Sequence, residues 1–196
     1  MPHAALEQPS PWVARFLALA PAGGRVLDLA AGGGRHTRLA RARGFSVTAV
    51  DRDVSGLADL GADSNVELLA ADLEGAPWPL GTRRFAAVLV SNYLHRPLLP
   101  KLVAAVADAG VLIYETFAIG NEAFGRPSNP NFLLKPGELL DAVRGALTVV
   151  AYENGKIETP RPAVIQRIAA VRGPSAPALP SSSSAWAPTT ASSTTT

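Results

Sequence analysis

A glycine run preceded by an acid supplies the groups best suited to ligand chemistry. The run Gly32-Gly33-Gly34 ends an apolar stretch, and Asp28 stands inside that stretch, four residues before Gly32. Glycine lets the backbone turn tightly and approach a ligand without a Cβ in the way. Residues 35–40 have the pattern of a helix start, which adds unpaired N–H groups and partial positive charge. This spacing predicts a site for a nucleotide-like ligand.

Two further acids stand at the ends of the next apolar runs. The β-branched run 45–50 stops at Asp51, and the short run 66–71 stops at Asp72. A carboxylate after the second strand of such a unit is placed to accept hydrogen bonds from both hydroxyls of a ribose. Each acid alone could equally begin a turn or cap a helix. At three successive strand ends, however, the acids predict one ligand-binding edge of a parallel sheet.

The order Asp28, Ala30, Gly32, Gly34 resembles the motif of class I S-adenosylmethionine-dependent methyltransferases, an acid followed by glycines at alternating positions. The resemblance covers roughly residues 12–171. Alanine replaces the first glycine, a mild departure because a small side chain still allows close approach. The resemblance implies S-adenosyl-L-methionine as the cofactor. The Gly32–Gly34 loop would hold its amino acid end, and Asp28 would organise that end.

The same resemblance assigns the rest of the cofactor site. Asp51 would bind the ribose, with Arg52 beside it. Asp72 would accept a hydrogen bond from the adenine amino group, and the Leu73 N–H would meet a ring nitrogen. Asn92 would follow the cofactor at the end of the fourth strand and face the substrate.

The alternation of apolar runs and helical segments predicts an α/β domain with a doubly wound, mostly parallel sheet. In the resembling family this Rossmann-like methyltransferase fold has seven strands, the last of them antiparallel. We expect this fold to occupy residues 1–172. Helices are expected over residues 12–20, 98–107 and 136–144, and a further helix is expected to begin at residue 35. The strands are expected at 26–31, 45–50, 66–71, 85–90, 111–116, 147–152 and 163–171.

Catalytic candidates are expected beyond the carboxyl ends of the fourth and fifth strands. The fourth strand leads into Tyr93 and His95, and the fifth contains Glu115. A general base is needed only if the methyl acceptor carries a proton at neutral pH. His95 is the first candidate for that role and Glu115 the second, while Tyr93 is expected to contact the substrate. A solvated strand-to-helix loop is the alternative interpretation.

Residues 118–135 form an unusually long connection and hold Phe124, Arg126, Asn129 and Phe132. Such a loop inside a small domain is usually a lid or a binding segment, although it could simply tether two elements. Its Gly-Arg-Pro and Asn-Pro pattern resembles small bacterial methyltransferases of unassigned substrate.

Composition narrows the classes of function. With 47% hydrophobic and 17% charged residues among 196, the chain is of the size and type of one globular domain. It contains no cysteine, which excludes disulfides and a thiol nucleophile, and its three histidines lack metal-ligand spacing, so no metal is expected. The net charge is +2, and no basic run interleaves with aromatic residues, so nucleic acid is not an expected partner. The arginines of the first helix (Arg35, Arg38, Arg41 and Arg43) are expected on its solvated face.

Localisation and the C-terminal segment follow from the same reasoning. The apolar stretch 12–20 is interrupted by Arg15 and is too short to span a bilayer. A cytoplasmic protein is therefore expected. Its substrate is expected to be a small molecule, and the sequence does not indicate an oligomeric state. Residues 173–196 are almost all Ser, Thr, Ala or Pro, and are expected to be a disordered tail.

Two alternatives stay open. A glycine loop followed by an acid is also typical of NAD(P)-dependent oxidoreductases, although Thr37 stands where that fingerprint has its third glycine. A cofactor-binding module without catalysis would be favoured if residues 91–96 and 118–132 formed no pocket beside the cofactor.

Overall fold

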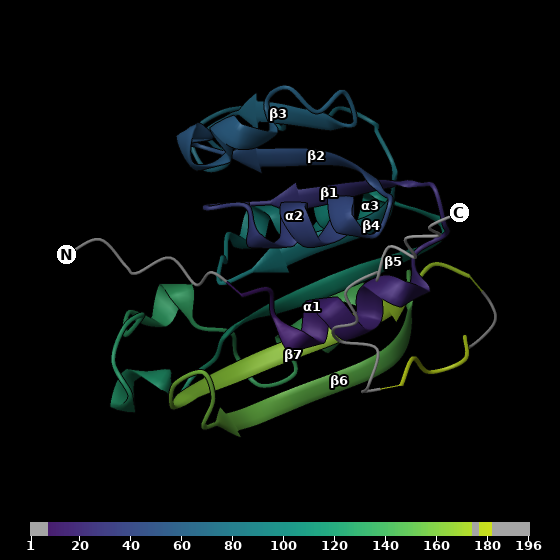
Figure 1. Cartoon of the computed structure of the whole chain (residues 1–196). Coiled ribbons are helices and arrows are strands. Elements are labelled where there is room, and N and C mark those ends of the chain that lie inside the picture. Colours follow the sequence, from purple (N-terminus) through teal and green to yellow (C-terminus); the bar gives the residue numbers. More distant parts are fainter. Residues whose placement is uncertain (1–7, 174–176, 182–196) are drawn as a thin grey trace, which may run out of the picture.

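A single mixed sheet of seven strands runs through the computed structural model, which describes residues 8–173 and 177–181 (Figure 1). The spatial order of the strands is β3-β2-β1-β4-β5-β7-β6. In chain order the strands are β1 (Arg25–Leu29), β2 (Ser46–Asp51), β3 (Val66–Ala70), β4 (Phe85–Ser91), β5 (Val106–Phe117), β6 (Thr148–Ile157) and β7 (Ala163–Val171).

The five strands in the spatial run β3-β2-β1-β4-β5 pair in parallel with their neighbours. Strand β7, by contrast, is antiparallel to both β5 and β6. The predicted mostly parallel sheet with an antiparallel strand near its end is therefore confirmed. The parallel part brings the carboxyl ends of β1, β2 and β4 to one edge, which is where ligands bind in open α/β sheets.

Short helices cover both faces of this sheet (Figure 1). Ser10 caps the first of them by accepting hydrogen bonds from the backbone N–H groups of Trp12 and Val13. The α-helices are α1 (Pro11–Phe16), α2 (Arg35–Ala42), α3 (Leu99–Ala104) and α4 (Glu138–Val143). The 3-10 helices are η1 (Leu17–Leu19), η2 (Ser55–Leu60), η3 (Arg96–Leu98), η4 (Asn121–Ala123) and η5 (Pro130–Phe132).

Alternation along the strands divides the core into two layers, because successive side chains point to opposite faces. Val26 of β1 packs with Phe16 of α1 and Leu39 of α2 on one face. Leu27 of the same strand belongs to the other layer, which includes Leu102 of α3 and Leu139 of α4. The sheet is thus doubly wound, as predicted.

The helix predicted over 98–107 was wrong at its C-terminal end. It stops at Ala104, and β5 begins at Val106, which pairs with Phe85 of β4. A bulge follows, at which Ala109 adopts a φ of 58°. Pairing with β4 overrides the helical preference of this alanine-rich stretch, a tertiary effect that local pattern does not report.

Most of the expected tail, residues 174–176 and 182–196, lies outside the described residues. Residues 177–181 are neither helix nor strand, and the Pro180 carbonyl accepts a hydrogen bond from Arg15 Nε at 3.1 Å. Among the described residues, no helix is both long and apolar enough to cross a membrane.

Candidate active site

The turn after β1 uses left-handed backbone at alternate residues. Ala30, Gly32 and Gly34 have φ angles of 55°, 53° and 77°. Glycine adopts this conformation freely, whereas for alanine it costs about 1–2 kcal/mol. The alanine at the first motif position is therefore a larger departure than close approach alone suggests. Such strain is typical of functional sites, where surrounding structure maintains it.

The second and third of these positions have different roles. A Cβ built on Gly32 would meet nothing within 4 Å, so the loop is open to a ligand at this point. A Cβ on Gly34 would lie 2.1 Å from Leu57 Cδ2, so η2 can pack only against glycine there. Gly34 is also the residue before α2. It thus shapes the turn, while Gly32 borders the cavity.

Asp51 joins the end of β2 to the glycine loop. Its Oδ2 accepts a hydrogen bond from the Gly32 backbone N–H at 2.7 Å, and its Oδ1 accepts one from the Asp53 N–H at 3.1 Å. A carboxylate offers about four acceptor positions, so each oxygen keeps capacity for a further donor. Asp51 is therefore placed to accept hydrogen bonds from a ligand beside the loop.

Asp28 lies beneath the loop and is only 2% exposed. Its Oδ2 accepts a hydrogen bond from Thr37 Oγ1 at 2.6 Å, which links β1 to the first turn of α2. Burial raises the pKa of Asp28 to about 6, although the Thr37 hydrogen bonds oppose that shift. In the structure, Asp28 holds the strand and the helix on either side of the loop together.

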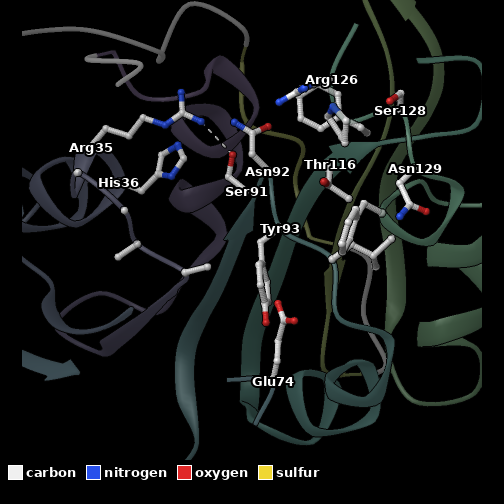
Figure 2. A pocket seen from close by; sticks show the side chains of 18 of the residues that line it. Arg35, His36, Glu74, Ser91, Asn92, Tyr93, Thr116, Arg126, Ser128 and Asn129 are labelled. Carbon is white, nitrogen blue, oxygen red and sulfur yellow. Dashed lines mark hydrogen bonds between the residues drawn. The ribbon is translucent and has the colours of Figure 1, made fainter. Parts of the chain in front are cut away.

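A cavity of about 1040 Å³ opens between this loop and residues 126–132 (Figure 2). Its wall on the side of the loop includes Arg35 and His36 of α2. Its lining is Ala30, Ala31, Gly32, Gly33, Arg35, His36, Glu74, Ser91, Asn92, Tyr93, Leu94, Thr116, Phe117, Arg126, Pro127, Ser128, Asn129, Phe132 and Arg161.

The strand ends of β4 and β5 form the middle of the cavity. Asn92 follows β4 with a φ of 56°, a conformation that asparagine tolerates better than most residues. Tyr93 points toward Glu74 (Figure 2), and its hydroxyl is buried without a well-formed hydrogen bond in the described part of the chain. Burial and the Glu74 carboxylate raise the pKa of Tyr93 well above its usual value, so the phenol is protonated at neutral pH.

Arg35 turns toward β4 rather than to solvent. Its Nη2 donates to Ser91 Oγ at 3.0 Å, and its Nη1 donates to the Gln8 carbonyl at 3.1 Å. Ser91 Oγ in turn lies 3.3 Å from Glu115 Oε1, within hydrogen-bond distance. The carboxylate of Glu115 thus lies behind Ser91, and the pKa of Arg35 is lowered because burial outweighs its attraction. The expectation that Arg35 belongs to a solvated face was wrong.

His36 is buried at 4% exposure beside Arg35 and is not a ready base. Its Nε2 accepts a hydrogen bond from the Ser10 backbone N–H at 3.1 Å. Burial, with a smaller contribution from the Arg35 charge, lowers the pKa of His36 to about 3. The neutral imidazole therefore attaches the start of α1 to α2.

Residues 118–135 are tied down by buried polar side chains. Asn121 is 2% exposed; its Nδ2 donates to the Pro127 carbonyl at 2.9 Å, and its Oδ1 accepts from the Val164 N–H at 3.2 Å. Arg96 donates to the carbonyls of Asn131 and Leu133 at 2.7 and 2.8 Å. The sequence left open whether this connection is a binding segment or a tether. In the structure it is held to the rest of the domain and also lines the cavity.

The structure brings together only some of the predicted site residues. Those that line the cavity are Ala30, Gly32, Asn92 and Tyr93. Those that do not are Asp28, Gly34, Asp51, Arg52, Asp72, Leu73, His95 and Glu115. Sequence reasoning missed Arg35 and Arg161, whose spacing carries no signal, and Glu74, which looked like part of a loop.

The expected adenine end lies along the neighbouring strand ends. The Asp72 carboxylate accepts a hydrogen bond from the Glu74 N–H at 3.0 Å and lies 3.6 Å from Arg52 Nη2, on a partly exposed surface. The side chain of Leu73 is buried in the core beneath it. Among the described residues, no group of three or more His, Asp and Glu side chains could hold a metal ion.

Comparison with solved structures identifies the fold. No protein-family model matches this chain, and neither does any curated protein sequence. The 1,6-didemethyltoxoflavin-N1-methyltransferase of Burkholderia thailandensis, solved with 1,6-didemethyltoxoflavin and S-adenosylhomocysteine, superposes with a TM-score of 0.62 at 21% identity. The match covers 84% of this chain and 77% of that chain. An S-adenosylmethionine-dependent methyltransferase of Mesorhizobium loti gives 0.64 at 20% identity, over 83% and 98% of the two chains.

The chain therefore has the fold of class I S-adenosylmethionine-dependent methyltransferases. The same fold also occurs in the [4+2]-cyclase SpnF, which matches with a TM-score of 0.62 at 14% identity, over 83% of this chain and 79% of that chain. Fold alone thus defines the architecture and leaves the reaction to the site.

Proposed function

We propose that this protein is an S-adenosyl-L-methionine-dependent methyltransferase that acts on a small-molecule nucleophile. The observation that carries the proposal is the cavity of about 1040 Å³, which adjoins the glycine loop and continues to residues 126–132. A module that only bound a cofactor would have no need of this second wall. The volume is at the upper end of the range usual for small-molecule sites.

The donor and acceptor groups around the loop fit this cofactor. Gly32 offers open space for a ligand, and the guanidinium of Arg35 is suited to the carboxylate of the amino acid end. The carboxylate of Asp51, with one acceptor position left on each oxygen, is suited to ribose hydroxyls. Asp72 and the Leu73 N–H would bind the adenine, farther along the same edge.

Bound S-adenosylmethionine would supply a sulfonium methyl that is already activated for transfer. The protein then has to hold the acceptor in line and exclude water. Tyr93 lines the cavity with a protonated hydroxyl, and it would orient an acceptor by donating a hydrogen bond once that hydroxyl, now buried and pointing toward Glu74, is exposed by a rearrangement on binding. His95 and then Glu115 are our candidate general bases; since neither lines the cavity, either role requires a rearrangement on binding.

The oxidoreductase alternative has less support. The typical dinucleotide-binding sheet is parallel with order 3-2-1-4-5-6, whereas β7 here is antiparallel and lies between β5 and β6. Thr37, at the position of the third fingerprint glycine, uses its side chain to bind Asp28.

Calorimetric titration tests the proposal directly. S-adenosylmethionine and S-adenosylhomocysteine should bind with micromolar or lower Kd, about 8 kcal/mol or more of binding free energy, and NADH and NADPH should not. A screen of small nucleophiles (phenols, amines, thiols, carboxylates and chalcogen oxyanions) for release of S-adenosylhomocysteine then tests turnover. Binding of NADH without binding of S-adenosylhomocysteine would overturn the proposal.

A further inference from the structure

Two arginines of the cavity have no hydrogen-bond or ion-pair partner among the residues that the structure describes. Most arginines of the chain form ion pairs with Asp or Glu side chains, as Arg41 does with Asp63 at 2.7 Å. Within the described residues, Arg126 and Arg161 form neither an ion pair nor a hydrogen bond. Both nevertheless line the same cavity, although they lie on segments 35 residues apart in the sequence.

Positive charge exceeds negative charge among the side chains that line the cavity. Its lining includes three arginines, Arg35, Arg126 and Arg161, and a single carboxylate, that of Glu74. Figure 2 shows Glu74 beneath Tyr93, at the end of the cavity away from Arg126. A concave site lined by charge of one sign raises the local concentration of the opposite charge, here of anions.

Aromatic side chains accompany these arginines. The Arg161 guanidinium lies over the Phe117 ring, 5.7 Å from its centroid, which favours one orientation of that guanidinium. Phe132 lines the same cavity and is 48% exposed, unusual for so large an apolar side chain. The cavity therefore offers flat apolar surface beside two unpaired positive charges.

The backbone that carries Arg126 is held in place. The next residue, Pro127, accepts a hydrogen bond from the buried Asn121 side chain through its carbonyl, at 2.9 Å. Asn121 is attached to β7 through Val164. The unpaired charge of Arg126 is thus presented from an anchored segment, a pre-organised arrangement that lowers the entropy lost on binding an anion.

We propose that the methyl acceptor is a small anion, with a planar apolar body and a carboxylate or phosphate group that Arg126 and Arg161 bind. A guanidinium matches two oxygens of such a group with two parallel N–H donors, and lysine cannot replace it in that geometry. The apolar body would lie against Phe117 and Phe132. This inference rests on the proposed function and adds the substrate class to it.

Binding to protein saturated with S-adenosylhomocysteine tests the inference. The probes are paired planar acids and their neutral amides: hydroxybenzoates with hydroxybenzamides, and indole carboxylates with indole carboxamides. Phenyl phosphate is a further arm that separates phosphate from carboxylate. The variants are Arg126→Gln, Arg161→Gln and their combination. Arg144→Gln is the matched control, because Arg144 pairs with Asp141 outside the cavity.

We expect at least one acid of the panel to bind at least tenfold more tightly than its amide. Each cavity variant should remove most of that difference, the control should keep it, and Arg161→Lys should restore only part of it. Equal affinity for every acid and amide pair, or variants that bind the acids as the wild type does, would overturn the inference.

The cofactor arm separates the two proposals. Arg126→Gln and Arg161→Gln should leave the affinity for S-adenosylhomocysteine unchanged. If they weaken it while 5′-methylthioadenosine, which lacks the amino acid end, binds as before, these arginines hold the cofactor's carboxylate and the acceptor inference is wrong. Failure of the wild type to bind S-adenosylhomocysteine would instead refute the proposed function.

Discussion

Replacement of Asp51 by alanine examines the proposed cofactor site at its best-defined point. The carboxylate already accepts the Gly32 N–H at 2.7 Å and the Asp53 N–H at 3.1 Å, one on each oxygen. Both contacts are at an exposed position, so water can replace the lost acceptor. The substitution should therefore lower the melting temperature only slightly.

The loss in binding follows from the acceptor positions that are left. A hydrogen bond to a charged group contributes about 1.5–3 kcal/mol, and the two ribose hydroxyls would share the remaining capacity of one carboxylate. We therefore expect Asp51→Ala to weaken S-adenosylhomocysteine by about 1.5–3 kcal/mol, roughly 10- to 150-fold in Kd. The related nucleoside 5′-methylthioadenosine keeps the ribose and should lose the same amount.

Calorimetric titration of Asp51→Ala with both ligands measures the loss of affinity, and thermal unfolding of the same variant measures its stability. Asp53→Ala is the matched control, because it removes a carboxylate two residues away whose hydrogen bond, among the described residues, is to its own turn, from the Ser55 N–H. Unchanged affinities in Asp51→Ala with native melting would refute a ribose role. A melting temperature lower by many degrees would show that Asp51 chiefly holds the loop.

Four further predictions follow from the geometry. Arg35→Gln should weaken the binding of S-adenosylhomocysteine about tenfold or more in calorimetry and leave the affinity for 5′-methylthioadenosine unchanged. An equal loss for both ligands would show that Arg35 does not bind the amino acid end of the cofactor. Ala30→Gly should raise the free energy of unfolding by about 1 kcal/mol in urea, because φ is 55° there; a lower value would argue against the strain. The pKa of Asp28 rises from 3.8 to about 6 on burial, so stability from its protonated form is fully present below pH 3.8 and lost as the pH rises through about 6. From pH 4 to pH 7, Asp28→Asn should therefore gain roughly 2.5 kcal/mol relative to wild type in urea unfolding, and a pH-independent difference would contradict this. Once a substrate is found, His95→Ala should slow single turnover by about a hundredfold or more if His95 is a base. Tyr93→Phe should also slow single turnover, and both variants should keep the cofactor affinity of the wild type. Single-turnover rates equal to those of the wild type would remove these residues from the mechanism.

The glycine loop and the positions of the strands along the chain could be predicted because they depend on local requirements. Gly32 and Gly34 mark a left-handed turn that most residues avoid, and apolar runs of strand length recur between helical segments. Parallel pairing then places Asp51 beside the loop by topology alone. The strength of the strain at Ala30 could not be judged, since sequence does not report φ.

Only the tertiary structure decided which side chains share the cavity. Pairing of β5 with β7 brings the segment before β7, with Arg161, to the wall that residues 118–135 form, and no sequence spacing records that approach. The inward position of Arg35, at the start of α2, depends in the same way on its hydrogen bond to Ser91 at the end of β4. Backbone turns are decided by the residues that make them, whereas convergence of charges depends on non-local packing, so the substrate side of the site emerges only once the sheet is assembled.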